Sequence, residues 1–591
     1  MSSDEESPLR VAIGISFGNS YSSIACTIAS DAKVIANEDG DRQIPSILSY
    51  SNGEEYHGSQ AKALLIRNPK NTITSFRDFL GKKYVDLYPF IPSDTVDKNI
   101  KFADMTSRFE MIDPTPCHSS AHPQEYEDTV AFSIKDTEDD SSNTVTVSEI
   151  TTRHLRRLKH SASDYLGKQV NAAVITVPTD FTDAQKASLL EAAKNAGLDV
   201  LQLISEPIAA LLAYDRVEKP ADKIVVVADL GGTRSDVAVV STKGGMYSIL
   251  ATAHDYFLGG AQLDEVLMEY FAKEFIKKHK KDPRENERGL AKLKFESEAT
   301  KKALSLGTTA AFNAESLVDS TDFASSINRS RYELLAGKVF AKFTRLIESA
   351  VEKAELDVLD IDEILLAGGT SHTPRIATNV QSSFPPHTRV IAPLASSSFL
   401  NPSELSVRGA SLQAFLIEGF DQDDIEQSTH PMVTVTPHLA QTLGLVVVSA
   451  SGVEDFKPVI LAETPLPVRR TVTFINAAKG EGVLLRLCEG YRDTKITRAA
   501  PKRKTNGTTD EDSDGDSDDE EVDVKERVWK VGNPLGELSL KGVKTGAKVT
   551  VQINVALDLE LSLSAMEVGV GKAGVRGTIP GTGAAMNGKV H

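Results

Sequence analysis

Residues 11–22 read VAIGISFGNSYS, and residues 224–236 repeat the same outline as IVVVADLGGTRSD. Each copy contains an apolar run of strand length, a glycine turn and a second β-rich run. Glycine lets the backbone turn tightly and lets its N–H groups approach a phosphate. Two such hairpins facing each other predict a two-lobed protein that clamps a polyphosphate. Asp229 ends the strand of the second copy where the first copy has Ser16, so we expect the site to hold a nucleotide better than it cleaves one.

The length and composition indicate a multidomain globular protein. With 591 residues, the chain exceeds what one core usually supports and should form three or four structural units. It has no apolar run of membrane-spanning length, so we expect no membrane partner. Residues 1–8 are acidic and polar, unlike a secretory signal, and should form a disordered tail. The three scattered cysteines argue against a disulfide framework and for a reducing, cytoplasmic location.

The formal net charge of −18 opposes direct binding to nucleic-acid phosphate, so we expect no direct nucleic-acid binding. Much of the negative charge lies in residues 510–521, DEDSDGDSDDEE, which are too repulsive and too poor in apolar residues to pack. We therefore expect a disordered acidic insertion over residues 499–525. It is either a solvated spacer between two strands or, if Ser513 and Ser517 are phosphorylated, a region that tunes docking to a basic partner.

Strand-like runs alternate with helical runs over residues 9–420, which is the pattern of an α/β lobe pair. Residues 182–195 predict a helix with Thr182 or Asp183 as its N-cap. Residues 363–367 predict a strand that leads into a third glycine turn. We therefore expect one large α/β domain in this part of the chain.

The composition changes after this region. Residues 421–431 are polar and lack a helical or strand period, so they are the expected interdomain linker. Beyond them, apolar residues alternate with polar or small ones between residues 549 and 563, at the period of half-buried strands. We expect a compact β domain over residues 432–566. Closely spaced glycines over residues 567–591 predict a flexible tail.

These motifs resemble those of the heat-shock-70 chaperone family, in the family's order. IGISFGNSYS at 13–22 resembles the first phosphate hairpin, SEPIAA at 205–210 the element that joins the lobes, and DLGG at 229–232 the second phosphate hairpin. EATKKALS at 298–305 is similar to the adenosine-binding helix, and GGT at 368–370 to the third nucleotide contact. Five motifs in register make chance a poor explanation. The resemblance implies an α/β fold: an actin-like, two-lobed nucleotide-binding domain, then a truncated β-sandwich similar to the family's peptide-binding domain, with no helical lid.

The resemblance also implies that ATP, with or without magnesium, binds between the lobes. The implied contacts come from the two hairpins, a later Gly-Gly pair, the adenosine helix and the third glycine turn: Gly18, Asn19, Ser20, Tyr21, Gly231, Gly232, Thr233, Arg234, Gly259, Gly260, Glu298, Lys301, Lys302, Ser305, Gly368, Gly369 and Thr370. Glu298 resembles the carboxylate that accepts from the ribose hydroxyls. The four residues of the adenosine helix share one face because they lie three or four positions apart.

The catalytic positions of the family are degenerate in this chain. In the family, an acid of each hairpin helps to hold magnesium and its waters, and a lysine orients the attacking water. Ser16, Asp229 and Arg77 stand at the matching positions. Asp229 is therefore the expected magnesium residue, through water, whereas Ser16 supplies no fixed charge and Arg77 presents a planar fork in place of an ammonium. Glu206 keeps the acid of the joining element, yet we expect ATP hydrolysis to be lost or very slow.

Arg234 is a further departure, since it replaces a threonine of the family and follows Thr233, which replaces a glycine. A guanidinium beside the terminal phosphate would strengthen ground-state binding without accelerating the chemistry. The alternative is that Arg234 points to solvent, and the sequence favours both interpretations equally. Ala261 stands where the family usually has an acid after the Gly-Gly pair.

The polar linker, the missing lid and the missing charges together resemble one branch, the atypical heat-shock-70 members of the fungal ribosome-associated complex. This resemblance implies a stable pair with a zuotin-type J-domain protein, stimulation of a second, active heat-shock-70-type chaperone, and assistance to nascent chains at the ribosome in the cytoplasm. ATP would be a structural ligand that locks the lobes. The β domain would dock the N-terminal segment of the partner, plausibly by edge-strand addition.

Two other functions stay open at this point. An active foldase would have to sustain ATP hydrolysis with Arg77 and Glu206 and without a carboxylate at Ser16. A small-molecule kinase on the same fold would need an acidic base aimed at a hydroxyl substrate, and the sequence offers no clear residue for that role. The trailing β domain also argues against the kinase.

Overall fold

The structure is a computed structural model that describes residues 10–84, 121–135, 143–217, 222–243, 245–393, 401–421, 423–425, 439, 441–448, 454–462, 464–476, 482–498, 523–556, 559–568 and 574–580. The chain divides into two compact units, one from residues 1–242 and 249–430 and the other from residues 243–248 and 431–591. The expected tail at residues 1–8, residues 499–522 of the acidic insertion with Ser513 and Ser517, and most of the expected linker lie outside the described residues.

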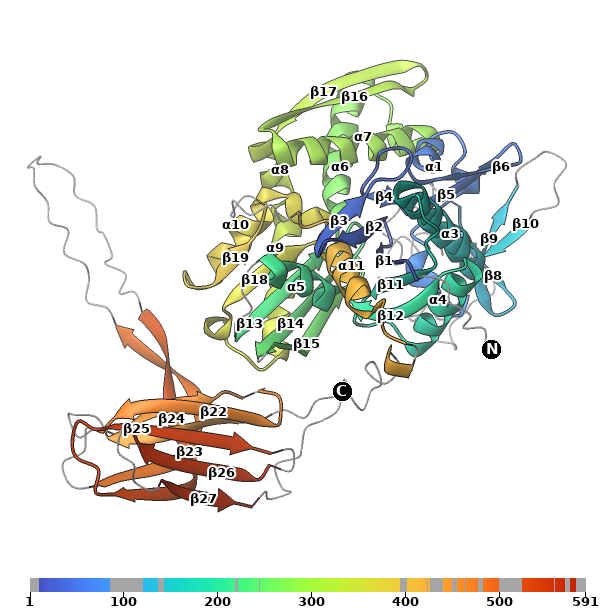
Figure 1. The fold of residues 1–591 in the computed structure, drawn as a ribbon. Coiled ribbons are helices and arrows are strands. Elements are labelled where there is room, and N and C mark those ends of the chain that lie inside the picture. Colours follow the sequence, from blue (N-terminus) through green and yellow to red (C-terminus); the bar gives the residue numbers. More distant parts are fainter. Residues whose placement is uncertain are drawn as a thin grey trace, which may run out of the picture. The chain divides into compact units, whose positions relative to one another are not determined.

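The first lobe of the larger unit is built on a sheet with the strand order β12-β11-β1-β2-β3, and β4 pairs with β2 (Figure 1). Its strands are β1 (Ala12–Phe17), β2 (Tyr21–Ile28), β3 (Asp31–Ile35), β4 (Ile44–Pro45), β11 (Ala172–Val177) and β12 (Asp199–Ser205). The β1–β2 pair is antiparallel and β1–β11 is parallel. Every residue of β11 is buried, as expected for a strand that is covered on both faces.

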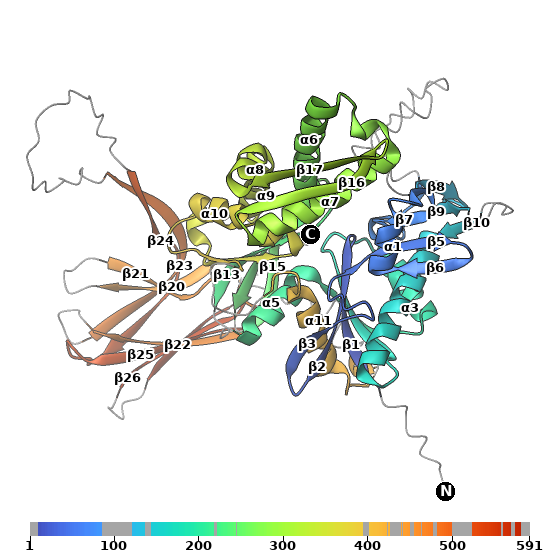
Figure 2. The same ribbon diagram turned by 90° about the horizontal axis from the view of Figure 1, so that it is seen from above.

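Helices cover both faces of this sheet. They are α3 (Val147–Leu166), α4 (Asp183–Asn195), α5 (Glu206–Val217) and α11 (Leu405–Ile417). Figures 1 and 2 both place α11 between α5 and the β1–β3 strands. This approach requires glycine at position 409, because a Cβ there would lie 1.7 Å from the carbonyl oxygen of Ala209 in α5.

The second lobe repeats the pattern of the first. Its sheet has the order β15-β14-β13-β18-β19, in which β13 is antiparallel to β14 and parallel to β18. The strands are β13 (Lys223–Leu230), β14 (Ser235–Lys243), β15 (Met246–Asp255), β18 (Glu363–Ala367) and β19 (Arg389–Ile391). The helices are α6 (Gly260–His279), α7 (Glu287–Leu306), α8 (Arg329–Leu335), α9 (Gly337–Lys353) and α10 (Pro374–Ser383). Each lobe therefore presents one glycine-tipped hairpin, as the repeated sequence predicts.

Smaller elements complete this unit. Three further sheets contain β5 (Ile47–Ser51), β6 (Glu54–His57) and β7 (Thr72–Thr74); β8 (Pro123–Tyr126), β9 (Thr129–Ile134) and β10 (Asn143–Thr146); and β16 (Thr309–Val318) with β17 (Thr321–Asn328). The short helices are α1 (Gly58–Leu64) and the 3-10 turns η1 (Pro69–Asn71), η2 (Arg77–Phe79), η5 (Pro283–Glu285), η6 (Val358–Asp360) and η7 (Gly369–His372). Each lobe has its own large apolar core.

Local sequence signals explain several boundaries. Helix α4 begins after Thr182, whose side chain accepts from the Gln185 N–H while the Gln185 side chain bonds back to the Thr182 backbone. This reciprocal capping box confirms the expected helix and selects Thr182 as its N-cap. The strand expected at residues 363–367 is confirmed as β18.

The smaller unit contains two four-stranded antiparallel sheets with the orders β21-β20-β23-β24 and β22-β25-β26-β27. The strands are β20 (Thr442–Val448), β21 (Glu454–Ile460), β22 (Val468–Ile475), β23 (Gly482–Arg498), β24 (Asp523–Lys541), β25 (Lys548–Val555), β26 (Leu561–Glu567) and β27 (Val575–Ile579). Apolar side chains from both sheets form one core. Strands therefore make up the described part of this unit, as its alternating sequence pattern predicts.

Two expectations for this region are wrong in part. Residues 575–579 were expected in a flexible glycine-rich tail, but they form β27, which pairs with β26 over five residue pairs. Strand β24 begins at Asp523, so the last three residues of the expected insertion belong to a strand. Backbone pairing with the preceding strand outweighs the local preference of a glycine-rich segment.

Candidate nucleotide site

The larger unit contains a cavity of about 600 Å³ between its two lobes. The cavity is lined by both hairpin tips, the start of α5, the face of α7 that is predicted to bind adenosine, and the glycine turn after β18. All the residues predicted for the site line this cavity except Gly259. Gly259 packs behind the second hairpin, where a Cβ would lie 2.7 Å from the Gly232 carbonyl oxygen.

The two hairpins face each other, as predicted. The Asn19 side-chain amide of the β1–β2 turn donates to Thr233 Oγ1 of the β13–β14 turn over 3.0 Å, and this bond is buried. Ser20 lies so close to the second turn that a Cβ on Gly232 would be 2.4 Å from its hydroxyl oxygen. The two strand turns therefore form one continuous floor of the cavity.

The third glycine turn joins this floor. Gly368 has a φ of +80°, which favours glycine, and a Cβ there would lie 2.5 Å from Asp229 Oδ1. Thr370 Oγ1 donates to the Gly231 carbonyl oxygen over 2.8 Å. Backbone from three separate turns is thus brought together within one cavity.

Carboxyl groups and arginines share the floor. Burial raises the pKa of Asp229 to about 6, with Asp236 adding repulsion. Burial also raises the pKa of Glu206 to about 8, against the opposing charge of Arg77. Arg77 is itself buried and donates to Glu206 Oε1 over 3.1 Å and to the Phe17 carbonyl oxygen over 3.2 Å. Ser16 lines the cavity and adds no charge to this group.

Arg234 does not point to solvent, so that interpretation is wrong. The residue is 5% exposed, and its guanidinium donates to Asp236 through Nε and Nη2 and to Asp180 Oδ1 over 2.9 Å. Its Nη1 lies 3.8 Å from Asp78 Oδ1. Its position beside a terminal phosphate stays a prediction.

The predicted adenosine helix contributes a network that crosses the cleft. Glu298 of α7 accepts from the Tyr21 hydroxyl over 2.5 Å and from Lys62 Nζ over 2.7 Å, both on the first lobe. Lys302 Nζ lies 2.8 Å from Glu298 Oε1, the oxygen that also accepts from Tyr21, and it donates to the Tyr21 hydroxyl. The Lys302 side chain is more exposed than that of Lys62. Burial raises the pKa of Glu298 in isolation, but Lys62 and Lys302 outweigh it and hold the pKa below its ordinary range. The carboxylate is therefore ionised and ties the lobes together.

Lys301 and Ser305 play a different part from the other two. Lys301 Nζ donates to the Gly260 carbonyl oxygen over 2.8 Å and to Asp264 Oδ2 over 2.9 Å, which ties α7 to α6. Ser305 Oγ donates to the Lys301 carbonyl oxygen over 3.3 Å. Both residues still line the cavity.

Comparison with known proteins decides the family. Residues 12–437 match the Hsp70 protein family. The chain belongs to the Hsp70 family. It is 43% identical over 563 residues to the ribosome-associated complex subunit SSZ1 of Saccharomyces cerevisiae, covering 95% of this chain and 98% of that protein. These findings confirm the predicted resemblance to the family and to its ribosome-associated-complex branch.

Two further Hsp70 relatives set the scale of this similarity. A heat shock protein 70 homolog of Schizosaccharomyces pombe is 41% identical over 566 residues, covering 94% of this chain and 93% of that protein. Heat shock cognate 70 kDa protein 3 of Dictyostelium discoideum is 30% identical over 552 residues, covering 93% of this chain and 76% of that protein. Identity is thus 43% and 41% for the relatives from Saccharomyces cerevisiae and Schizosaccharomyces pombe, and 30% for the relative from Dictyostelium discoideum.

The cavity suits the nucleotide that the Hsp70 family implies. Its volume of about 600 Å³ lies within the usual range for cofactor sites. Asn19 Oδ1 is buried there without a hydrogen-bond partner among the described groups, and a hydroxyl or a metal-bound water would satisfy it. Gly18, Gly231 and Gly232 line the cavity at the hairpin tips, so no side chain of theirs stands between a phosphate and the turn backbone. The residues present therefore fit a nucleotide.

Several residues of this Hsp70 site were not predicted. Lys62, Asp78, Asp180, Tyr256 and Asp264 pair with the predicted residues across or beside the cleft. Asp78 adjoins Arg77 in the sequence and could have been proposed from that position. The other four lie outside the glycine motifs, and only the fold brings them to the site.

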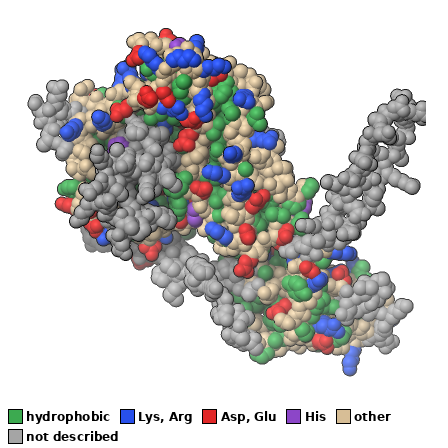
Figure 3. Space-filling model, turned by 180° about the vertical axis from the view of Figure 1, so that it is seen from behind, with side chains coloured by type: hydrophobic (Ala, Val, Ile, Leu, Met, Phe, Trp, Pro, Cys, Tyr) green, Lys and Arg blue, Asp and Glu red, His purple; other side chains and the backbone are tan. Residues whose placement is uncertain are grey.

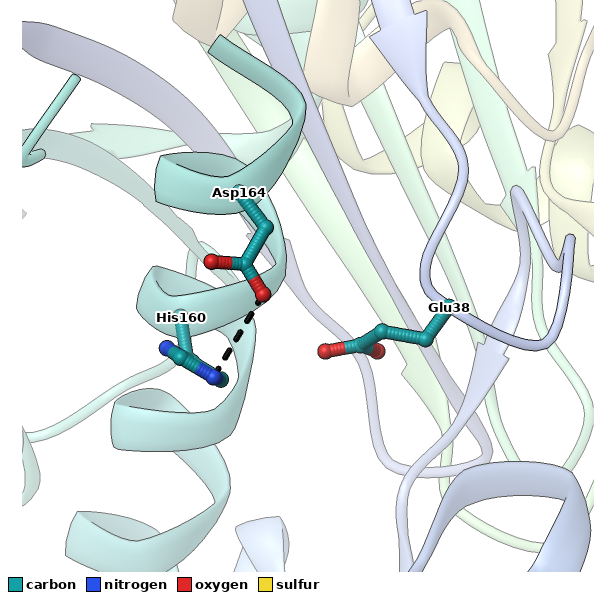
Figure 4. Close-up of side chains that lie close together, drawn as sticks. All are labelled: Glu38, His160 and Asp164. Carbon is teal, nitrogen blue, oxygen red and sulfur yellow. Dashed lines mark ion pairs between the residues drawn. The ribbon is translucent and has the colours of Figure 1, made fainter. Parts of the chain in front are cut away.

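A second group of ionisable side chains lies away from the cleft. Glu38, from the loop after β3, approaches His160 and Asp164 of α3 (Figure 4). His160 Nε2 lies 3.4 Å from Asp164 Oδ2, and Glu38 accepts from Ser161 and lies 3.5 Å from Arg157. All three are exposed and already have polar partners, so they form a solvated polar cluster. On the face drawn in Figure 3, acidic and basic side chains are likewise interspersed over the described surface.

No helix among the described residues is both long and apolar enough to cross a membrane.

Proposed function

We propose that this chain is the Hsp70-type subunit of a ribosome-associated complex and that it holds ATP as a structural ligand with little or no hydrolysis. The relative from Saccharomyces cerevisiae carries the complex in its name, and it aligns over almost the full length of both proteins. The observation that carries the nucleotide part is the buried Asn19–Thr233 bond, which joins two phosphate-type hairpins of separate lobes.

The residues that would hold ATP fall into two groups. The hairpin tips and the Gly368 turn would bind the phosphates through backbone N–H groups. The α7 face with Glu298 would bind the nucleoside. When bound, the triphosphate supplies a multivalent anion that backbone groups of both lobes can share, so its binding would stabilise the closed arrangement of the lobes.

Slow hydrolysis is proposed from the state of the charged residues. Phosphoryl transfer depends on positioned metal, an oriented water and counter-charge, and each contributes orders of magnitude in rate. Ser16 supplies no carboxylate opposite Asp229. Arg77 uses its guanidinium on Glu206, Asp78 and the Phe17 carbonyl oxygen, and these contacts fix its position. Burial also favours the protonated form of Glu206, which weakens its attraction for a metal ion.

The partners in this proposal are a zuotin-type J-domain protein, the ribosome with its nascent chains, and a second, active Hsp70-type chaperone. Strands β21, β24, β22 and β27 end the two described sheets of the smaller unit. Such end strands are suited to edge-strand addition by an extended segment of the J-domain protein. Hydrogen exchange would test this docking mode: partner binding should slow exchange of one end strand, and equal exchange of all four strands with and without partner would contradict it.

The whole proposal is tested by isolating the tagged chain from its native cells. The proposal expects sedimentation with ribosomes, a J-domain protein at equal stoichiometry, and ATP in the extracted nucleotide. A chain that elutes alone, or that yields ADP only, would contradict it. ADP in the extracted nucleotide would favour the alternative of an active foldase. The family assignment gives no support to the kinase alternative.

A further inference from the structure

Asp180 connects the two lobes through a group of polar contacts next to the hairpin floor. It follows β11 of the first lobe, three residues before α4 begins. Its Oδ1 accepts from Arg234 Nη2 over 2.9 Å, and its Oδ2 accepts from the Tyr256 hydroxyl over 2.7 Å. Arg234 and Tyr256 both belong to the second lobe, so each oxygen of one carboxylate is used for a separate contact across the cleft.

Asp236 fixes the direction of the arginine. Arg234 Nε donates to Asp236 Oδ2 over 2.8 Å, and Nη2 donates to the other carboxylate oxygen. This two-point contact anchors the guanidinium plane on its own hairpin. The Arg234 guanidinium carbon also lies 4.6 Å from the centre of the Tyr256 ring. The free side of the fork is therefore aimed at the first lobe, where Asp180 and Asp78 lie.

The charges around Arg234 support a stable ion cluster. Burial opposes the charged form of Asp180, but the Arg234 guanidinium outweighs it and holds the pKa of Asp180 below its ordinary value. The same balance, with Arg77 and Arg234 as the opposing charges, lowers the pKa of Asp78. His254 Nδ1 lies 2.6 Å from Asp236 Oδ1, and the buried carboxyl groups of Glu206 and Asp229 also interact with Asp236 and Arg234. Removing the Asp180 charge would leave the buried Arg234 guanidinium with its partner on its own hairpin and weaken its tie to the first lobe.

We infer that Asp180 is a positioning residue of an interlobe latch, formed by Asp180, Arg234, Asp236 and Tyr256, which keeps the cleft closed and slows the departure of the nucleotide. This inference rests on the proposed function, because it takes the ligand of the cavity to be ATP. The latch acts on the rate at which the lobes part and requires no hydrolysis. It also gives Arg234 a role that differs from both interpretations made from the sequence.

The test compares Asp180→Asn with a matched control in the same segment. Asp183→Asn changes a fully exposed carboxylate whose only described ion pair is with Lys186 at 3.5 Å. Each variant is loaded with a fluorescent ATP analogue, and dissociation is followed by stopped flow after an excess of ATP is added. Asp180→Asn should release the analogue about tenfold faster than the unchanged chain, and Asp183→Asn within about twofold of it.

A second, smaller substitution tests the latch independently of any misfolding of Asp180→Asn. Tyr256→Phe removes only the hydroxyl that donates to Asp180 and keeps the ring beside Arg234, so it should accelerate release by about threefold. Circular dichroism verifies that each variant folds. Release rates of Asp180→Asn and Tyr256→Phe equal to that of the unchanged chain would overturn the latch.

Failure of the latch is distinguishable from failure of the proposed function. If the unchanged chain keeps ATP and both variants keep it equally well, the latch is wrong and the proposed function stands. If the unchanged chain holds no ATP, the proposed function is wrong. The latch is then decided without nucleotide, by the distance distribution between spin labels at the exposed positions Glu191 of α4 and Glu352 of α9. Asp180→Asn should broaden this distribution, and an unchanged distribution would overturn the latch.

Discussion

Asn19 and Thr233 join the tips of two hairpins that belong to different sheets, through a buried hydrogen bond of 3.0 Å from the Asn19 amide to Thr233 Oγ1. The resemblance to the Hsp70 family implies a glycine at the position of Thr233. A hydroxyl at this point therefore gives the second hairpin an acceptor for the first, so that the two turns meet directly.

Thr233→Val tests this bond. Valine keeps the shape of threonine and removes the acceptor, which leaves the Asn19 amide unsatisfied and should cost about 1 kcal/mol. Bound nucleotide should then dissociate about fivefold faster in a stopped-flow experiment. Thr233→Ser keeps the oxygen and is the matched control. Equal release from the valine and serine variants would show that the bond does not hold the turns together.

The pairing of Glu298 predicts a ranking of two lysines. The Lys62 side chain is 19% exposed, whereas that of Lys302 is 59% exposed, although both contact this carboxylate. Lys62→Met should therefore weaken nucleotide affinity by about tenfold, because it removes the less exposed partner, which lies across the cleft. Lys302→Met should change it by less than about threefold, as is usual for an exposed pair. Isothermal titration measures both, and a larger effect at Lys302 would contradict the network described.

Glu206 gives the nucleotide-free protein a pH dependence of known sign. Burial raises its pKa from 4.5 to about 8, so the folded state binds this proton more tightly than the unfolded state. Its contribution to stability is full below about pH 4.5 and is lost as the pH rises through about 8. Between these pH limits, the free energy of unfolding should decrease less steeply with rising pH in Glu206→Gln than in the unchanged chain. Urea titrations at several pH values measure the slope, and identical slopes for both proteins would contradict the assignment.

Gly409 provides a test of the packing that supports the site. Gly409→Ala would place a methyl group 1.7 Å from the Ala209 carbonyl oxygen and force α11 away from α5. Overpacking of this kind should lower the free energy of unfolding by about 3 kcal/mol. Gly337→Ala is the control, because nothing lies within 4 Å of its added Cβ, and it should be neutral or stabilise α9 by up to about 1 kcal/mol. Equal urea midpoints for the two variants would contradict this packing.

The sequence predicted the parts of the site that depend on local signals. The repeated strand, glycine turn and strand gave both hairpins, since apolar runs and glycine constrain the backbone within a few residues. The spacing of Glu298, Lys301, Lys302 and Ser305 placed them on α7 because the helical period fixes which residues share a face.

The remaining features depend on contacts between distant segments. Asp180 and Arg234 are 54 residues apart, and no local pattern indicates that they pair. The sequence could not decide whether Arg234 points to solvent, because the burial of its side chain depends on residues of the opposite lobe. Strand β27 was missed for another reason: it lies in a glycine-rich segment and gains its order by pairing with β26, the strand just before it.

The central claim is that this Hsp70 keeps ATP intact as part of its structure. The most direct test is a single-turnover experiment in which the full chain, in its native complex, is loaded with ATP labelled at the terminal phosphate and magnesium is added. The account predicts that the label stays on protein-bound ATP over a period in which an ordinary Hsp70, measured alongside, converts its ATP to ADP. Release of labelled phosphate at the rate of the ordinary Hsp70 would contradict the claim, and so would failure of the purified chain to retain ATP.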